Sequence, residues 1–127
     1  MSKRIAIIGA GVAGANLASK LSSNGFDVTV YEKARGTGGR ASSRHFLDGD
    51  KTYTVDHGAQ YIDVVSDEFQ TFIDGLEQAK VVEKFTKLGT QNTYVPVPAM
   101  NTFAKYLMKD IEAHYEITAQ RVIRKEQ

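Results

Sequence analysis

The chain has 127 residues, of which 42% are hydrophobic and 24% are charged, and 16 Lys and Arg nearly balance 15 Asp and Glu. This length corresponds to about one domain, and the composition argues against a disordered chain. The net charge of +1 argues against a nucleic-acid-binding domain, and the absence of cysteine excludes disulfides, thiolate metal sites and thiol nucleophiles.

Membrane insertion is not expected from the hydropathy of the chain. No run approaches the roughly 18 consecutive apolar residues of a membrane-spanning helix. Residues 5–17 resemble the apolar part of a signal peptide, but three glycines interrupt them and no small-residue cleavage pattern follows. Together with the lack of cysteine, this favours a soluble cytoplasmic protein that contacts neither membrane nor nucleic acid.

The first part of the chain predicts a strand, a helix and a second strand. Residues 4–8 are a short β-branched run that Gly9 stops, which is typical of a fully buried strand. Apolar and small residues at helical spacing follow, and Asn24-Gly25 is expected to end this helix. Residues 26–31 are a second strand, so the segment predicts a βαβ unit with a right-handed crossover.

A hairpin and a second helix are expected in the middle of the chain. Residues 43–57 predict two strands around the turn Asp48-Gly49-Asp50, because an Asp-Gly pair between strand-like runs is a hairpin signal. Ser66 is expected to cap a helix with acidic residues in its first turn. The apolar face of this helix consists of Phe69, Phe72, Ile73 and Leu76.

Further strands and a third helix are predicted toward the C-terminus. Residues 81–85 and 93–97 are strand-like, and Pro96 and Pro98 restrict the second segment to an edge strand or an extended loop. Asn101 is expected to cap a helix whose apolar face includes Phe103, Leu107 and Ile111. Residues 115–118 and 121–124 predict two strands around a short turn.

These elements predict an α/β fold that forms a single domain over residues 1–127. Specifically, we expect a Rossmann-like βαβ domain with an inserted β-hairpin and helices, and with an incomplete parallel sheet. Because an open sheet edge is a hazard that proteins usually cover, a homodimer or a partner chain over this edge is expected.

A dinucleotide-binding motif joins the first strand to the first helix. Residues 9–14 read Gly-Ala-Gly-Val-Ala-Gly, and Glu32 follows the second strand, 18 residues after Gly14. Gly9 permits the tight turn, Gly11 lets the backbone approach a pyrophosphate, and Gly14 lets the helix pack closely. The helix N-terminus favours the diphosphate, and Glu32 can accept the hydroxyls of an adenosine ribose. This pattern alone fits NAD and FAD equally.

A second glycine-rich loop distinguishes these two cofactors. Glu32-Lys33 and Gly38-Gly39-Arg40, separated by four residues, resemble the signature of the flavin-containing amine oxidase superfamily. This resemblance implies an FAD/NAD(P)-binding Rossmann-like domain, in which Arg40 and the neighbouring backbone amides hold the FAD pyrophosphate from its second side. An arginine suits this role because its planar fork can meet two phosphate oxygens at once.

Two later segments resemble the renalase-like branch of that superfamily. Residues 55–62 (VDHGAQYI) are similar to its D-x-G-A-Q-Y segment, which implies that Gln60 and Tyr61 lie beside the flavin. Residues 97–101 (VPAMN) are similar to a segment near the flavin ring, although Pro98 and its neighbours replace the glycines of that branch. Val122 stands where the superfamily has a valine whose backbone faces the adenine.

The expected cofactor site therefore draws on several separate segments. Its residues are Gly9, Gly11, Val12, Ala13, Gly14, Glu32, Lys33, Gly39, Arg40, His57, Gly58, Ala59, Gln60, Tyr61, Met100 and Val122. His45 and His114 are expected at the surface, and no histidine pair has metal-ligand spacing. No catalytic acid or base is assigned, because the flavin itself carries out the oxidation in many flavoproteins.

Three functions remain open from the sequence. The resemblance implies an FAD-binding oxidoreductase of the amine oxidase type, in which the flavin accepts a hydride from an amine or a reduced nicotinamide. It covers only the first part of the family's chain, so a non-catalytic FAD- or ADP-binding fragment or subunit that needs a partner chain is the alternative. An NAD-dependent dehydrogenase is a third reading, which leaves Gly38-Gly39-Arg40 unexplained.

Overall fold

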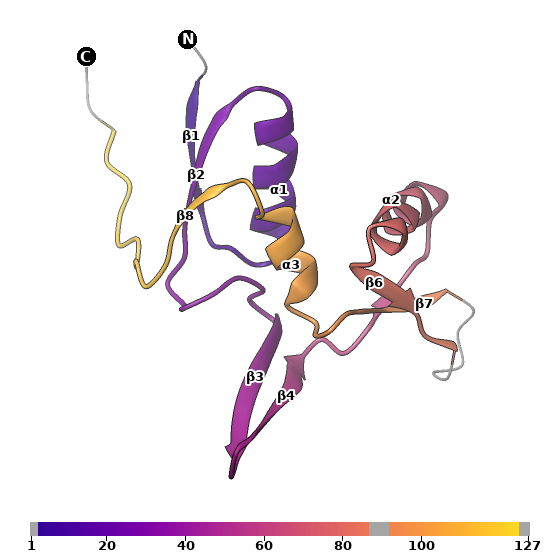
Figure 1. Ribbon diagram of the computed structural model, residues 1–127. Coiled ribbons are helices and arrows are strands. Elements are labelled where there is room, and N and C mark those ends of the chain that lie inside the picture. Colours follow the sequence, from indigo (N-terminus) through magenta and orange to yellow (C-terminus); the bar gives the residue numbers. More distant parts are fainter. Residues whose placement is uncertain (1–2, 87–91, 125–127) are drawn as a thin grey trace.

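The computed structural model describes residues 3–86 and 92–124, in which three helices accompany eight strands (Figure 1). The helices are α1 (Val12–Ser23), α2 (Asp67–Gln78) and α3 (Thr102–Leu107). The strands are β1 (Arg4–Ile8), β2 (Asp27–Tyr31), β3 (Ala41–Asp48), β4 (Lys51–Gly58), β5 (Ile62–Asp63), β6 (Val82–Lys84), β7 (Thr93–Pro96) and β8 (Glu112–His114).

A three-stranded parallel sheet with the order β1-β2-β8 confirms the expected α/β fold. Helix α1 connects β1 to β2 and packs against both strands, and α3 packs against α1 (Figure 1). The small residues Ala15 and Ala18 of α1 and Ala104 of α3 are completely buried, which permits close packing of these elements. The predicted βαβ unit is therefore confirmed, and the parallel sheet is open.

Strand β1 differs from the fully buried strand that its sequence predicts. It lies at an end of the sheet, paired only with β2 among the described residues, and Ile8 is 60% exposed. Ile7 is buried on the face that α1 covers. The apolar side chains of β1 are therefore buried on one face only, and β1 is an exposed edge strand.

The predicted hairpin is confirmed as β3 and β4, which pair antiparallel from Ala41–Gly58 to Asp48–Lys51. It extends away from the parallel sheet (Figure 1). Its base is fixed by Asp56, whose Oδ1 accepts hydrogen bonds from the backbone nitrogen of Met100 (2.9 Å) and from the Ser43 hydroxyl (2.7 Å). The hairpin is thereby joined to the segment that precedes α3.

A second, antiparallel sheet has the order β5-β7-β6, so β7 is central and not the expected edge strand or loop. Pro96 is accommodated because residues of an antiparallel strand bond alternately to the two neighbours. The nitrogens that bond toward β6 include that of Val97, which donates to Val81 (3.0 Å). Pro96 therefore faces the β5 side, and β5 extends only to Ile62, which pairs with Tyr94.

The two later helices agree with their predicted starts, but α3 is shorter than expected. The Ser66 hydroxyl accepts a hydrogen bond from the Phe69 nitrogen (3.2 Å), which confirms it as the cap of α2. Asn101 precedes α3 without a side-chain capping bond, because its backbone is already helical (φ −69°, ψ −12°). Helix α3 ends at Leu107, and Ile111 packs against the core from the turn beyond it.

The two strands predicted after residue 114 are wrong. Strand β8 ends at His114, and Glu116 adopts φ 59°. The nitrogen of Glu116 then donates to the oxygen of Ala34 (3.1 Å), and that of Ile117 donates to the oxygen of Glu32 (3.0 Å). The chain is thereby directed across the carboxyl end of β2, and the apolar residues Val122 and Ile123 remain exposed.

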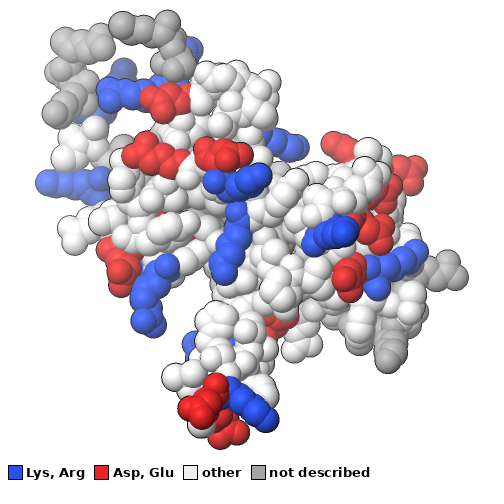
Figure 2. All heavy atoms as spheres, in the orientation of Figure 1, with Lys and Arg blue, Asp and Glu red and all other residues white. Residues whose placement is uncertain are grey.

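Charges of both signs are interspersed on the face seen in Figure 2, where no single-sign patch covers the surface. Among the described helices, none combines the length and the apolar character needed to cross a membrane.

Candidate functional site

The first glycine turn leads directly into α1 without a polar side-chain cap. Gly11 occupies the N-cap position (φ −69°, ψ 177°) and, having no side chain, makes no capping hydrogen bond to the amides of the first turn. A Cβ atom on Gly14 would overlap the carbonyl oxygen of Gly9, so the first turn of α1 lies against the backbone of the glycine turn. The close packing predicted for Gly14 is thus confirmed.

The second glycine loop lies against the first. Gly11 and Gly38 form an isolated parallel bridge, and the Gly38 nitrogen donates to the oxygen of Ala10 (2.9 Å). A Cβ atom on Gly39 would lie 3.2 Å from the Cα of Gly11, and Gly39 has φ 58°, which favours glycine. The two loops, separate in sequence, therefore meet backbone to backbone.

A groove of about 480 Å³ runs along this junction. It is lined by Gly11, Val12, Ala13, Gly38, Arg40, Ala41 and Ala59. The Ala59 nitrogen donates to the oxygen of Arg40 (2.9 Å), which ties the end of the hairpin to the second glycine loop. The groove thus combines one cationic side chain with the start of a helix, an arrangement that favours a phosphate or another anion.

Glu32 is buried at the end of β2, and both of its carboxylate oxygens accept backbone hydrogen bonds. Oε2 accepts from the nitrogen of Ala10 and Oε1 from the nitrogen of Ala34, each at 2.7 Å. The side chain, only 7% exposed, thereby links the first glycine turn to the segment after β2. The sequence predicts a ribose-binding role for Glu32 but does not reveal this structural one.

A smaller cavity, of about 230 Å³, opens beside Glu32. It is lined by Ile8, Gly9, Tyr31, Glu32, Lys33, Ile117, Thr118 and Ala119. The expected site residues Gly9, Glu32 and Lys33 therefore share one cavity. Val122, by contrast, is 92% exposed and does not line it, whereas Ile117, Thr118 and Ala119 form a wall that the sequence analysis missed. No motif in the sequence predicts this wall, because it is the turn at Glu116 that brings these residues to the cavity.

The remaining expected site residues lie at the base of the hairpin and beyond it. His57, Gly58, Gln60 and Tyr61 are exposed, and Tyr61 has 45% of its surface accessible. The side chain of Met100 is buried in the core and its nitrogen is bound to Asp56, so this residue packs and joins segments. Ser43 and Asp56, which make that junction, are not among the expected residues.

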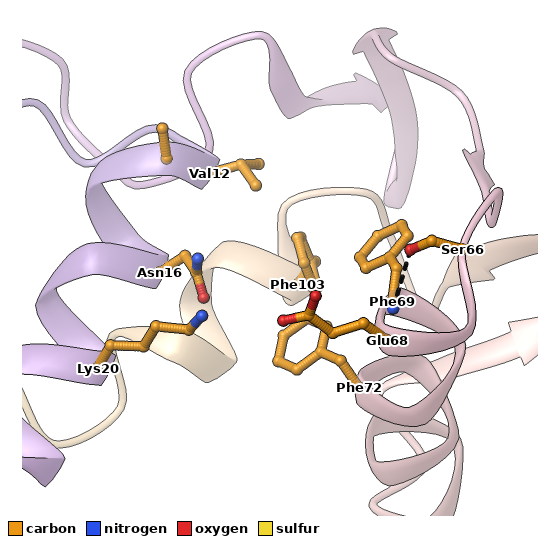
Figure 3. Close-up of a pocket in the computed structure, with 9 residues that line it drawn as sticks. Val12, Asn16, Lys20, Ser66, Glu68, Phe69, Phe72 and Phe103 are labelled. Carbon is orange, nitrogen blue, oxygen red and sulfur yellow. Dashed lines mark hydrogen bonds between the residues drawn. The ribbon is translucent and has the colours of Figure 1, made fainter.

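Another cavity, of about 300 Å³, lies between α1 and α2 (Figure 3). Phe69, Phe72 and Phe103 line it, and Phe72 contacts the other two rings with centroid distances of 6.1 Å. Asn16 and Lys20 from α1 and Glu68 from α2 add polar groups. Because Val12 and Ala13 line both this cavity and the groove, the two hollows adjoin at the start of α1.

Two further observations concern the ionisable side chains. Burial, followed by the negative charge of Glu32, raises the pKa of the Tyr115 hydroxyl above its usual value of 10.0. Within the described ranges, no group of three or more His, Asp or Glu side chains is arranged to hold a metal ion.

Comparison with known proteins links the chain to nucleotide-binding oxidoreductases. A family model described as an NAD(P)-binding Rossmann-like domain matches residues 7–76, more than half of the chain. Over 141 residues, 92% of this chain and 22% of the relative, the sequence is 30% identical to a phytoene desaturase of Cercospora nicotianae.

Two bacterial proteins share shorter regions. The chain is 43% identical over 58 residues to a hydroxysqualene dehydroxylase of Sinorhizobium fredii, which covers 46% of this chain and 13% of the relative. It is 50% identical over 40 residues to a zeta-carotene-forming phytoene desaturase of Myxococcus xanthus, which covers 32% and 8%. The chain thus spans less than a quarter of the length of each of these curated relatives.

Proposed function

The chain belongs to the NAD(P)-binding Rossmann-like domain family, within the superfamily of FAD-dependent oxidoreductases and amine oxidases, and from this premise we propose that it binds FAD in a flavin-dependent oxidoreductase. The observation that carries the proposal is the single groove in which the start of α1 and the Gly38-Gly39-Arg40 loop meet. A plain NAD site needs only the first glycine loop, whereas the second loop gives the groove a cationic wall.

The residues of the groove fit a diphosphate. The first-turn amides of α1 can donate to phosphate oxygens, and Arg40 can donate to two of them at once. Gly11 and Gly38 have no side chain that would keep a ligand away from the backbone. The diphosphate of FAD would therefore be held by Gly11, Val12, Ala13, Gly38 and Arg40.

The cavity beside Glu32 fits the adenosine end of the same ligand. Each carboxylate oxygen has more than one acceptor position, and each uses only one for the backbone, so Glu32 can still accept a ribose hydroxyl. Lys33 and the wall from Ile117 to Ala119 enclose this end. Gln60 and Tyr61, which follow the groove residue Ala59 in the chain, are the residues proposed to contact the flavin ring.

Bound flavin would supply the chemistry, by accepting a hydride from the substrate. The side chains of this chain would bind and orient the cofactor, and none is assigned as an acid or base. The renalase-like segment around Gln60 favours an amine or a reduced nicotinamide as hydride donor. The names of the relatives add phytoene and hydroxysqualene to the substrates that deserve testing.

The exposure of Tyr61 favours a second candidate, a nucleotide-binding subunit that is inactive alone. A catalytic flavin site is normally enclosed and dry, whereas His57, Gln60 and Tyr61 are open to solvent here. In this case another polypeptide segment, on the same or a partner chain, would cover the flavin ring.

Absorbance spectroscopy of the purified 127-residue chain, before and after incubation with FAD and gel filtration, tests both proposals. Flavin absorbance that elutes with the protein supports FAD binding, and bleaching of this absorbance by an amine or a reduced nicotinamide under anaerobic conditions supports an oxidoreductase. Bound but unbleached flavin supports the subunit. A colourless protein that binds NAD⁺ but not FAD contradicts the flavin-dependent oxidoreductase and leaves the nucleotide-binding subunit.

A further inference from the structure

The β3–β4 hairpin exposes four large apolar side chains. Phe46, Leu47, Tyr53 and Val55 are 52%, 80%, 48% and 51% exposed. Among the described residues the two strands pair only with each other, and an isolated two-stranded hairpin is marginally stable in water. An unpaired strand edge is also a template for another strand. The hairpin therefore has the properties of an interaction surface.

The two faces of the hairpin have different surroundings. On one face, Ser43 and Asp56 oppose each other and accept the backbone hydrogen bonds of Asn101 and Met100, so this face is turned toward α3. On the other face the opposed pairs are Arg44–Val55, Phe46–Tyr53 and Asp48–Lys51. The exposed apolar side chains of Phe46, Tyr53 and Val55 thus share this face, which has Arg44 at one end and the Asp48–Lys51 pair at the other. Charges of both signs gather at the hairpin tip (Figure 2).

The sequence of β3 is self-complementary when it is read in opposite directions. Residues 44–48 are Arg-His-Phe-Leu-Asp, so opposite charges stand at equal distances on either side of Phe46. We propose that β3 pairs antiparallel with β3 of a second copy of this chain, about a twofold axis at Phe46. Phe46 then faces Phe46 of the second copy, and Arg44 faces Asp48 of the second copy at both ends.

The charges favour this register over its neighbours. Opposite charges directly across an antiparallel pair stabilise it, and aromatic pairs do so as well. A shift by two residues in either direction would place Arg44 or Asp48 opposite Phe46 and lose both charge pairs. Because the twofold axis stands normal to the sheet, the outer faces of both copies lie on the same side. Phe46, Tyr53 and Val55 of each copy then form one continuous apolar strip.

Single cysteines test the register directly, because the chain contains no other cysteine. Facing residues of an antiparallel pair have Cα atoms about 4.5–5.5 Å apart, within the range of a disulfide. Phe46→Cys should therefore give a disulfide-linked dimer on a non-reducing gel after mild oxidation. Leu47→Cys is the control: Leu47 is more exposed but faces His45 of the second copy, so it should cross-link several-fold less. Equal cross-linking of the two variants, or none with Phe46→Cys, overturns the proposal.

Charge reversal tests the same contact by sedimentation equilibrium. The wild-type chain should approach twice its mass of 14.0 kDa as its concentration rises. Arg44→Asp and Asp48→Arg should each remain monomeric, because like charges then face each other twice, whereas an equimolar mixture of the two should associate again. Asp50→Arg, in the turn outside the paired segment, should associate like the wild type. A wild-type chain that stays monomeric, or a mixture that does not associate, overturns the proposal.

Discussion

The Oε2 atom of Glu32 lies 2.7 Å from the backbone nitrogen of Ala10, so the acid at the end of β2 holds the centre of the first glycine turn. The other carboxylate oxygen holds the nitrogen of Ala34 at the same distance. The backbone of Glu32 also bonds to His114 and Ile117. One buried residue thus connects the glycine turn, the segment after β2, the end of β8 and the chain that follows it.

Replacing this carboxylate should destabilise the fold as well as weaken cofactor binding. Glu32→Gln keeps the shape of the side chain but turns one acceptor into a donor, which cannot pair with a backbone N–H. A hydrogen bond to a charged group contributes about 1.5–3 kcal/mol, so the free energy of unfolding in urea should fall by about that amount. Glu83→Gln, at an exposed position of β6, is the control and should change little. Equal stability of the two variants would refute the structural role of Glu32.

Two helical glycines should respond oppositely to alanine. In Gly14→Ala the new Cβ overlaps the carbonyl oxygen of Gly9, and such overpacking costs about 1–3 kcal/mol. In Gly75→Ala the new Cβ meets open space on α2, and the helix should gain roughly 0.5–1 kcal/mol. Thermal or urea unfolding of both variants measures the difference. A Gly14→Ala variant as stable as the wild type would show that α1 does not pack against the glycine turn as described.

Arg40 should act on the phosphates of a ligand and on nothing else. Arg40→Ala removes the cationic side chain of the groove, so FAD and ADP should each bind at least tenfold more weakly, whereas adenosine should bind as before. The affinity of Arg40→Lys for FAD and ADP should lie between those of the wild type and Arg40→Ala, because a lysine keeps the charge but lacks the planar fork. Isothermal titration of the three ligands makes the measurement, and Arg35→Ala, at an exposed position earlier in the same loop, is the control. An equal loss for adenosine would place Arg40 away from the diphosphate.

The local elements could be predicted because their signals are local. The β-branched run before Gly9, the Asp-Gly turn and the Ser66 cap each act within a few residues, and the structure confirms all three elements. The meeting of the two glycine loops also follows from the sequence once the family resemblance is used, since the residues of both motifs line one groove.

The errors arose where distant contacts decided the outcome. The central position of β7 depends on how far β5 extends beside Pro96, which no local pattern records. The segment after His114 has the alternation of a strand, but the turn at Glu116 directs it to Glu32 and Ala34. For the same reason Ile117 to Ala119, and not Val122, line the cavity beside Glu32. Tertiary hydrogen bonds overrode local propensity in each case.

Tyr115 should make the stability of the fold decline at alkaline pH. Burial and the charge of Glu32 raise the pKa of its hydroxyl in the folded state above the unfolded value of 10.0. The folded state therefore binds this proton more tightly, and the contribution to stability is complete below pH 10 and is lost as the pH rises through the folded pKa. Tyr115→Phe should remove this part of the decline, while Tyr53→Phe, on the hairpin, should retain it.

The same tyrosine gives an independent readout of Glu32. Phenolate absorbance at alkaline pH, compared between the wild type and Tyr115→Phe, isolates the titration of Tyr115 from that of the other tyrosines. Glu32→Gln removes the negative charge, so the pKa of Tyr115 should move down toward 10.0, although burial should still hold it above that value. Should the titration of Tyr115 be the same with and without the carboxylate, the two groups do not interact, and the proximity of Tyr115 to the buried end of β2 would be wrong.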